Sequence, residues 1–348
     1  MIAYIVRRLI FLPFVWLAVT LVIFALMQAL SPRQRLALYV NVNPESFSSK
    51  LTPEAYQRLI DKFGINDPFY VQYAKWLGQV AHGNFGWSKT AQTPVLQAIK
   101  ERFPTSLELT LYAIAPVVLI ALWMGITAAV HRGQWQDHLT RAVTIVGAAF
   151  PSFVFALLAL LVFYGKLQWF PPGRLSLTTE QIVYSSAFTR FTGLVTLDAV
   201  LNGRFDILVE AWRHLFLPVV TWSFGSWVAL TQVTRSAMLE ALGQDYVTAA
   251  RAKGVPERQV VYSHARRNAM IPVVTLGVGS VIGLILGVFI TETIFNINGL
   301  GRLGVQAALS FDVPTELGIT VFDTGMIIMT NLLMDILYTV VDPRVRFS

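Results

Sequence analysis

The residues that could do chemistry are few in this sequence, and their spacing keeps them from acting together. There is no cysteine, which excludes thiolate metal sites and a cysteine nucleophile. Asp323 and Asp335 are twelve residues apart, and about 18 Å of helix at 1.5 Å per residue separates carboxylates too widely for paired acid and base catalysis. The histidines follow no metal-ligand spacing; they are His82, His131, His138, His214 and His264.

Two glycine-containing stretches also fall short of known phosphate-binding loops. Gly299-Leu300-Gly301 has no predicted strand before it, and a dinucleotide-binding loop requires that strand. Residues 83–90 contain Gly, Lys and Thr but lack the Gly-Lys-Ser/Thr order that cradles phosphates. We therefore predict that the chain is not an enzyme, hydrolyses no ATP, and binds no metal or cofactor of its own.

The amino-acid composition indicates what kind of protein carries these residues. Hydrophobic residues make up 55% of the 348 positions and charged residues only 14%, with a mean hydropathy of +0.57. This balance is typical of a membrane protein. The net charge of +7 is scattered between apolar blocks instead of gathered on one polar module, so we expect no nucleic-acid partner.

Six apolar segments reach the length of about 20 residues that a helix needs to cross a bilayer. The sixth carries Asp323 and Asp335, which are costly in hydrocarbon unless they face protein or water. The sequence therefore predicts an all-α integral membrane protein with six transmembrane helices. The segments are Leu9–Leu30, 107–130 (uncharged from Leu109 onward), 142–165, 215–234, 269–291 and 318–341.

Basic residues flanking the spans predict the orientation, because Lys and Arg are retained on the cytoplasmic side. With the N-terminus inside, the inner segments hold 12 Lys and Arg in 60 residues, and the remaining 15 are spread over more than twice that length. Both termini are then cytoplasmic. The predicted organisation is 1–30 with the first helix, an extracytoplasmic subdomain 31–106, and a core domain 107–348 that includes an inner loop, 235–268.

This inner loop carries helix start and stop signals. Asp245 is a residue type that caps helix N-termini, and Gly254 can end a helix in the left-handed conformation. A short helix over Tyr246–Lys253 follows. Pro256 then suits the first turn of a second helix that can run into the fifth span.

The short helix has Ala249 and Ala250 on one side, with Tyr246 and Val247 nearby, and its own loop covers it poorly. Such a helix is typical of an element that enters a groove in another protein. We therefore predict a docking element on the cytoplasmic side.

At this point the sequence resembles a known family. The loop is similar to the signature of binding-protein-dependent ABC importer permeases, described as Glu-Ala-Ala, three residues, then Gly: Ala249, Ala250 and Gly254 match, and Thr248 stands where the signature has Glu. The longer string 243–272 is similar to the oligopeptide/dipeptide/nickel branch of that family.

The resemblance covers nearly the whole chain. Its strongest later matches are the runs 292–295, 299–303 and 331–338, and the ending Asp342-Pro343-Arg344-Val345-Arg346 resembles the B-type permease of the pair. Two departures from the family pattern weaken the transfer of the family's cargo to this chain. Ser31-Pro32-Arg33 stands where the family commonly has Pro-Gly-Asp after the first span, and Asp323 stands where the family is usually apolar.

The resemblance implies a type I ABC importer permease fold in a bacterial or archaeal cytoplasmic (inner) membrane. It implies a second homologous permease as heterodimer partner, two cytoplasmic ATPase subunits that carry ATP and Mg, and an extracytoplasmic solute-binding protein. The implied cargo is a peptide, with oligosaccharide, nickel or another small solute as alternatives. A polytopic membrane enzyme and a self-contained channel are more distant alternatives for the function. The implied ATPase-coupling residues are Asp245, Tyr246, Val247, Thr248, Ala249, Ala250, Arg251, Ala252, Lys253 and Gly254.

Two further features concern the pathway. Gly279, Gly283 and Gly287 recur every four residues, which places them on one stripe of the fifth span, for close packing against a neighbouring helix or for lining the pathway. Asp323 is predicted nearer the outer mouth, where it either snorkels to the interface or contacts a cationic group of the cargo.

Overall fold

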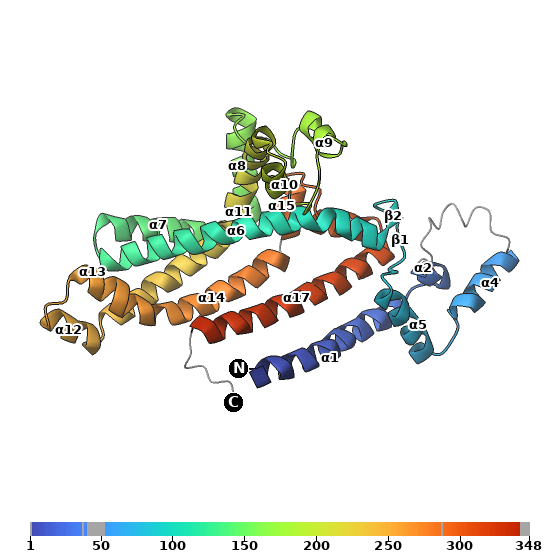
Figure 1. Ribbon diagram of the computed structural model, residues 1–348, viewed down its shortest axis with the longest axis horizontal. Helices are drawn as coiled ribbons and strands as arrows, with labels where there is room; N and C mark the ends of the chain where they lie inside the picture. Colours follow the sequence, from blue (N-terminus) through green and yellow to red (C-terminus); the bar gives the residue numbers. More distant parts are fainter. Residues whose placement is uncertain (1, 37, 40–52, 287, 342–348) are drawn as a thin grey trace. The chain divides into compact units, whose positions relative to one another are not determined.

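The computed structural model describes residues 2–36, 38–39, 53–286 and 288–341, and over them the chain is almost entirely helical (Figure 1). One two-stranded antiparallel hairpin joins Trp87 to Pro94. The elements are α1 (Ile2–Met27), α2 (Pro32–Leu36), α4 (Pro53–Phe63), α5 (Phe69–Ala81), β1 (Trp87–Ser88), β2 (Thr93–Pro94), α6 (Val95–Val130), α7 (Trp135–Ala149), α8 (Ser152–Ala159), the π-helical η1 (Leu160–Lys166), α9 (Leu177–Val183), α10 (Val195–Leu201), α11 (Phe205–Leu242), α12 (Asp245–Ala252), α13 (Glu257–Gln259), the π-helical η2 (Val260–Ala265), α14 (Arg266–Leu286), α15 (Val288–Ile294), α16 (Leu300–Leu309) and α17 (Val313–Val341).

Two helices of the described residues are long and apolar enough to cross a membrane, namely α1 through Ile10–Met27 and α6. The bent pair formed by α7 and α8–η1 adds a third if it counts as one span. Long helices also lie at the other predicted spans: α11 over 215–234, α14 and α15 over 269–291, and α17 over 318–341.

The predicted span 142–165 is not the single straight helix that its apolar length indicated. Its helix ends at Ala149, and α8 departs at 103°. Pro151 lacks an N–H and disfavours helical geometry at the residue before it, and Phe150 has the extended values φ −90° and ψ 124°. The X-Pro pair therefore breaks the segment.

The chain divides into two compact units. The first consists of Met1–Ser106 with Asn298–Leu332, and the second of Leu107–Ile297 with Leu333–Ser348. In the first unit α1 packs on α5 around Phe24, whose ring centroid lies 5.3 to 5.5 Å from those of Phe69, Tyr73 and Trp76.

A buried aspartate ties the hairpin of the first unit to the start of α17. Asp312 is 2% exposed and accepts hydrogen bonds from the Ser88 hydroxyl at 3.1 Å, the Thr90 amide at 2.8 Å and the Thr315 hydroxyl at 2.7 Å. Because a buried carboxylate needs such donors, the chain is held here by contacts between residues more than 200 positions apart.

In the second unit the core lies between α6, α11, α14 and the α12 region, around side chains such as Leu230, Met238 and Leu284. A smaller cluster of Val183, Phe188, Ala199 and Ile207 organises the segment that contains α9 and α10.

Glu108 joins that segment to α6. It is 1% exposed, forms an ion pair with Arg174, and accepts a hydrogen bond from the Thr196 amide at 2.8 Å. The segment between 166 and 213 is thus fixed by a buried ion pair as well as by its small apolar core.

Candidate functional site: the cytoplasmic helix and its supports

The predicted inner loop contains α12, an eight-residue helix that begins one residue earlier than the sequence indicated. The Asp245 cap prediction is wrong: Gln244 occupies the N-cap position, and no side chain caps the first turn. Asp245 is instead the first helical residue, where a carboxylate still interacts favourably with the positive end of the helix dipole.

The C-terminal end of α12 is as predicted. Gly254 has φ +74°, the left-handed conformation that a residue with a Cβ rarely adopts. Its amide donates to the Arg251 carbonyl at 2.9 Å, and the Val255 amide donates to the Ala250 carbonyl at 3.2 Å. This pair of bonds is the Schellman motif, which satisfies carbonyls left free by the end of the helix.

One face of α12 is anchored to its own chain. Val247 is fully buried and Ala250 is 8% exposed, and both join the core formed with Val260 and Val261 of η2. The expectation that its own loop covers this helix poorly is therefore wrong for Val247 and Ala250, because the i and i+3 positions share one side of a helix.

The opposite face is free within the described chain. Tyr246 is 39% exposed, and Thr248, Ala249, Ala252 and Lys253 are also exposed. Small side chains beside one aromatic ring leave the helix backbone approachable, which suits a helix that enters a groove.

An exposed ion pair connects α12 to the next helix. Arg251 donates to both carboxylate oxygens of Glu257, at 2.6 and 3.1 Å. The hydrogen bond from Arg251 lowers the pKa of Glu257. Together with the Schellman motif, this pair fixes the direction in which the chain leaves α12.

From Glu257 the chain is helical through α13, η2 and α14, as the sequence predicted. On the other side, α11 runs unbroken from Phe205 to Leu242 and ends two residues before α12. α12 is thus connected to a long helix on one side through residues 243–244 and, on the other side, through residues 253–256 to the helical run that leads into α14.

A second ion pair, which sequence reasoning missed, stabilises the start of this loop. Arg235 near the end of α11 donates to Asp137 of α7 at 2.6 and 3.0 Å, and Asp137 is almost fully buried. The hydrogen bond from Arg235 lowers the pKa of Asp137 to about 2, with a smaller contribution from the Gly133 amide. The partners are 98 residues apart, so no local pattern could pair them.

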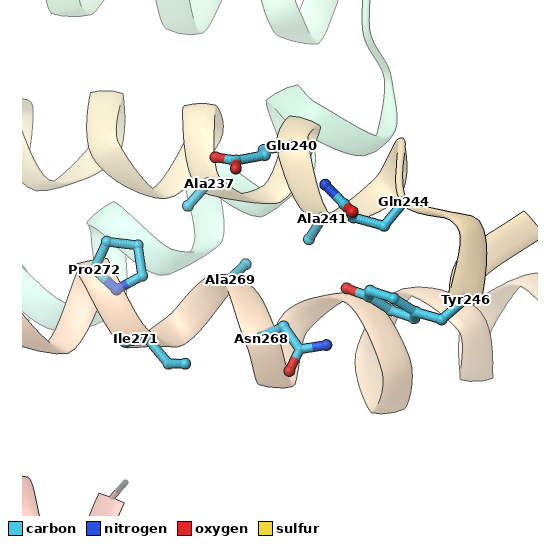
Figure 2. Close-up of a pocket in the computed structure, with 9 residues that line it drawn as sticks. All are labelled: Ala237, Glu240, Ala241, Gln244, Tyr246, Asn268, Ala269, Ile271 and Pro272. Carbon is cyan, nitrogen blue, oxygen red and sulfur yellow. The ribbon is translucent and has the colours of Figure 1, made fainter. Parts of the chain in front are cut away.

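Beside α12 lies an open pocket of about 400 Å³ between the end of α11 and the beginning of α14 (Figure 2). Small side chains form its floor, and Figure 2 shows Tyr246 and Asn268 on one side, with Glu240 and Gln244 opposite. Its lining consists of Ala237, Glu240, Ala241, Gln244, Tyr246, Asn268, Ala269, Ile271 and Pro272.

The predicted pathway residues with described positions lie on α14 and α17. A Cβ built on Gly279 or Gly283 would meet no described atom within 4 Å, so this stripe of α14 is not packed against the chain's own helices. Gly287 lies outside the described residues. Asp323 is half-buried on α17, in the first unit.

Comparison with known proteins agrees with this architecture. Residues 118–347 match the family model of the binding-protein-dependent transport system inner membrane component, and residues 1–110 match the model of the N-terminal part of such membrane components.

Similar proteins extend over the full length. An oligopeptide transport system permease protein of Bacillus subtilis is 33% identical over 348 residues, covering 100% of both chains. A dipeptide transport system permease protein of Alkalihalophilus pseudofirmus is 32% identical over 351 residues with the same coverage. A di/tripeptide transport system permease protein of Pseudomonas aeruginosa is 34% identical over 347 residues, 99% of each chain. The chain therefore belongs to the family of binding-protein-dependent transport system inner membrane components, as a multi-pass transport protein and not an enzyme.

Proposed function

We propose that this chain is the B-type permease subunit of an ATP-driven importer and forms half of the pathway through which peptides enter the cell. Support comes from the relatives, whose names refer to oligopeptide, dipeptide and di/tripeptide transport and which match the chain from end to end. Oligosaccharide, nickel or another small solute is the alternative cargo.

The proposed topology has six spans and cytoplasmic termini. Its supports are the denser Lys and Arg on the inner segments and the helices found at each predicted span, of which 142–165 is broken at Phe150–Pro151. Residues 1–30 form the first span with its N-terminal segment, 31–106 the extracytoplasmic subdomain, and 107–348 the core with five further spans and the coupling loop 235–268.

In this proposal residues Asp245 to Gly254 are the coupling element, and their exposed face docks on a cytoplasmic ATPase subunit. The single observation that carries it is the short connection of α12 to α11 and to the helical run into α14, with one face of α12 buried and the other free within the described chain. Closure of the ATPases then tilts the helices and opens the pathway to each side in turn.

The remaining assignments follow from the same mechanism. A second, homologous permease completes the pathway, two ATPase subunits hold ATP and Mg, and an extracytoplasmic binding protein delivers the cargo. The stripe of Gly279, Gly283 and Gly287 faces the pathway or the partner permease, because α14 leaves Gly279 and Gly283 uncovered. Asp323 is a candidate contact for a cationic cargo group.

The coupling assignment is tested by Gly254→Asp. Gly203→Asp is a matched control, because Gly203 also has a positive φ, of +67°, and open space at its Cβ, but precedes α11 at the opposite end of that helix from α12. We expect Gly254→Asp to abolish co-purification of the ATPases from membranes and Gly203→Asp to leave it intact. Retention of the ATPases and of import by Gly254→Asp would contradict the assignment.

The cargo is tested in vesicles that contain the assembled transporter and its binding protein. We expect uptake of a labelled dipeptide that depends on ATP and is suppressed by excess unlabelled dipeptide. ATP-dependent uptake of a labelled oligosaccharide or of Ni²⁺, with no uptake of the dipeptide, would assign the alternative cargo instead.

A further inference from the structure

The break between α7 and α8 is an uncovered piece of non-helical backbone. Phe150 and Pro151 are both extended, with ψ of 124° and 134°. All six residues from 148 to 153 are exposed in the described chain. An ordinary helix would pair its polar backbone groups at these positions, whereas the chain here is extended and its residues are exposed.

These backbone groups lack the partners that a continuous helix would provide. Carbonyls in the last turn of α7 have no following helical amide, and Pro151 has no N–H at all. The Pro151 carbonyl accepts from the Val154 and Phe155 amides. Ser152 and Phe153 are the first two residues of α8, so their amides have no partner within that helix. No side chain caps this end of α8.

The break also lies near the middle of a predicted span. Segment 142–165 is bounded by Arg141 and Lys166, and Phe150 is about 13 Å of helix beyond Arg141 at 1.5 Å per residue. That is close to half of a hydrocarbon core of about 30 Å. Lipid offers no hydrogen bonds, so open backbone at this depth must face protein or water.

Its own chain supports the break from one side. Phe155 stacks on Phe224 of α11 at 4.0 Å between ring centroids, and Phe224 meets Trp227 edge-on at 5.1 Å. A Cβ on Gly147 would lie 2.8 Å from Val228, so the glycine permits this close approach of α7 and α11. The other side carries the exposed small residues Ala148 and Ala149, which leave the backbone reachable.

A helix of a partner subunit is a poor cover for that side, because its own backbone groups are already paired. Water and the backbone of a passing peptide each supply both donors and acceptors. Resting on the proposed function, we propose that the Phe150–Pro151 break faces the aqueous pathway of the transporter, where its unpaired carbonyls and amides contact the backbone of the translocated peptide.

Because the chain has no cysteine, single cysteines report on water access without further engineering. Ala149→Cys in the assembled transporter, in membrane vesicles, is treated with a charged, membrane-impermeant methanethiosulfonate. The controls are Leu158→Cys, on an exposed face of α8, and the buried Ala156→Cys. We expect Ala149→Cys to react about tenfold faster than either control, because thiolates form in water and not in apolar surroundings.

A rate for Ala149→Cys no higher than that of Leu158→Cys would overturn the proposal, since the break would then be covered by lipid or by a partner. Ser152→Cys, on the other side of the break, gives the same test if Ala149→Cys does not assemble. This labelling requires no cargo, so its result does not depend on which solute is imported. If the transporter imports a solute other than a peptide, the proposed function fails, but Ala149→Cys still reacts fast.

The contact with cargo has its own readout. During ATP-driven import, saturating dipeptide is expected to slow the modification of Ala149→Cys by at least about threefold, because the peptide covers the thiol that must ionise in water. An unchanged rate in a transporter that imports the dipeptide would overturn the backbone contact.

Discussion

The short helix α12 and the ion pair of Glu108 are held in place in opposite ways. α12 depends on neighbouring residues: a left-handed glycine, an exposed pair six positions apart, and two small apolar contacts. Glu108 depends on Arg174 and Thr196, which are 66 and 88 positions away. Glu108 and Thr196 are buried, and the Arg174 side chain is only 11% exposed. Local and exposed contacts are individually weak, whereas a buried charge and its partner are costly to separate. The exposed face of α12 can therefore vary at small cost, whereas the partners of Glu108 cannot.

The largest effect is expected for Glu108→Ala. It leaves the guanidinium of Arg174 buried without its partner, and we expect the unfolding free energy to fall by about 3 to 5 kcal/mol. Thermal and denaturant unfolding in detergent measure the loss. Glu101→Ala, an exposed glutamate on the same helix, is expected to change stability by less than about 0.5 kcal/mol. Equal effects of the two changes would remove the contrast between buried and exposed charges.

The Asp137–Arg235 pair should give an effect of intermediate size that depends on pH. The pKa of Asp137 is about 2 in the folded chain and 3.8 in its ordinary state, so the pair contributes about 2 kcal/mol above pH 4 and loses this contribution as the pH falls through 2. Unfolding of the wild type and of Asp137→Asn should therefore differ most at neutral pH and converge in acid. A difference that grows as the pH falls would contradict the assignment.

Gly254→Ala is expected to cost about 1 kcal/mol, because alanine is strained at the φ of +74° that ends α12. Gly243→Ala is the matched control at the end of α11, where φ is −87° and the added Cβ would make only ordinary contacts. We expect the control to leave unfolding and ATPase co-purification unchanged. If Gly243→Ala proved the more harmful, the left-handed end of α12 would not be what positions the helix.

The smallest effect is expected for Arg251→Ala, which removes the exposed pair with Glu257. Side chains that are 45% and 58% exposed form pairs worth less than about 1 kcal/mol, and salt screens them. Unfolding measured in low and high salt should show a small difference that disappears in high salt. If Arg251→Ala lowered the unfolding free energy as much as Glu108→Ala, solvent exposure would not explain the difference in strength between the two ion pairs.

Parts of the site could be predicted from the sequence because their causes are local. Gly254 ends α12 since only glycine readily adopts that conformation, and Pro256 starts the next helix since its ring suits a first turn. Asp245 was a misleading signal, because an aspartate serves equally well as the first helical residue. Hydropathy alone also missed the break at Phe150, although the X-Pro pair there was a usable sign.

The sequence by itself determined the membrane class, the helical composition and the position of the short helix α12 along the chain, because apolar run length and turn residues act over a few neighbouring positions. Only the tertiary structure decided that Val247 turns inward, that Asp137 meets Arg235, and that Glu108 and Asp312 each close a buried network. The physical reason is that a buried polar group must find a hydrogen-bond partner, and it takes this partner from whichever element the fold brings beside it. Such partners are far apart in the sequence, so no local pattern reveals them.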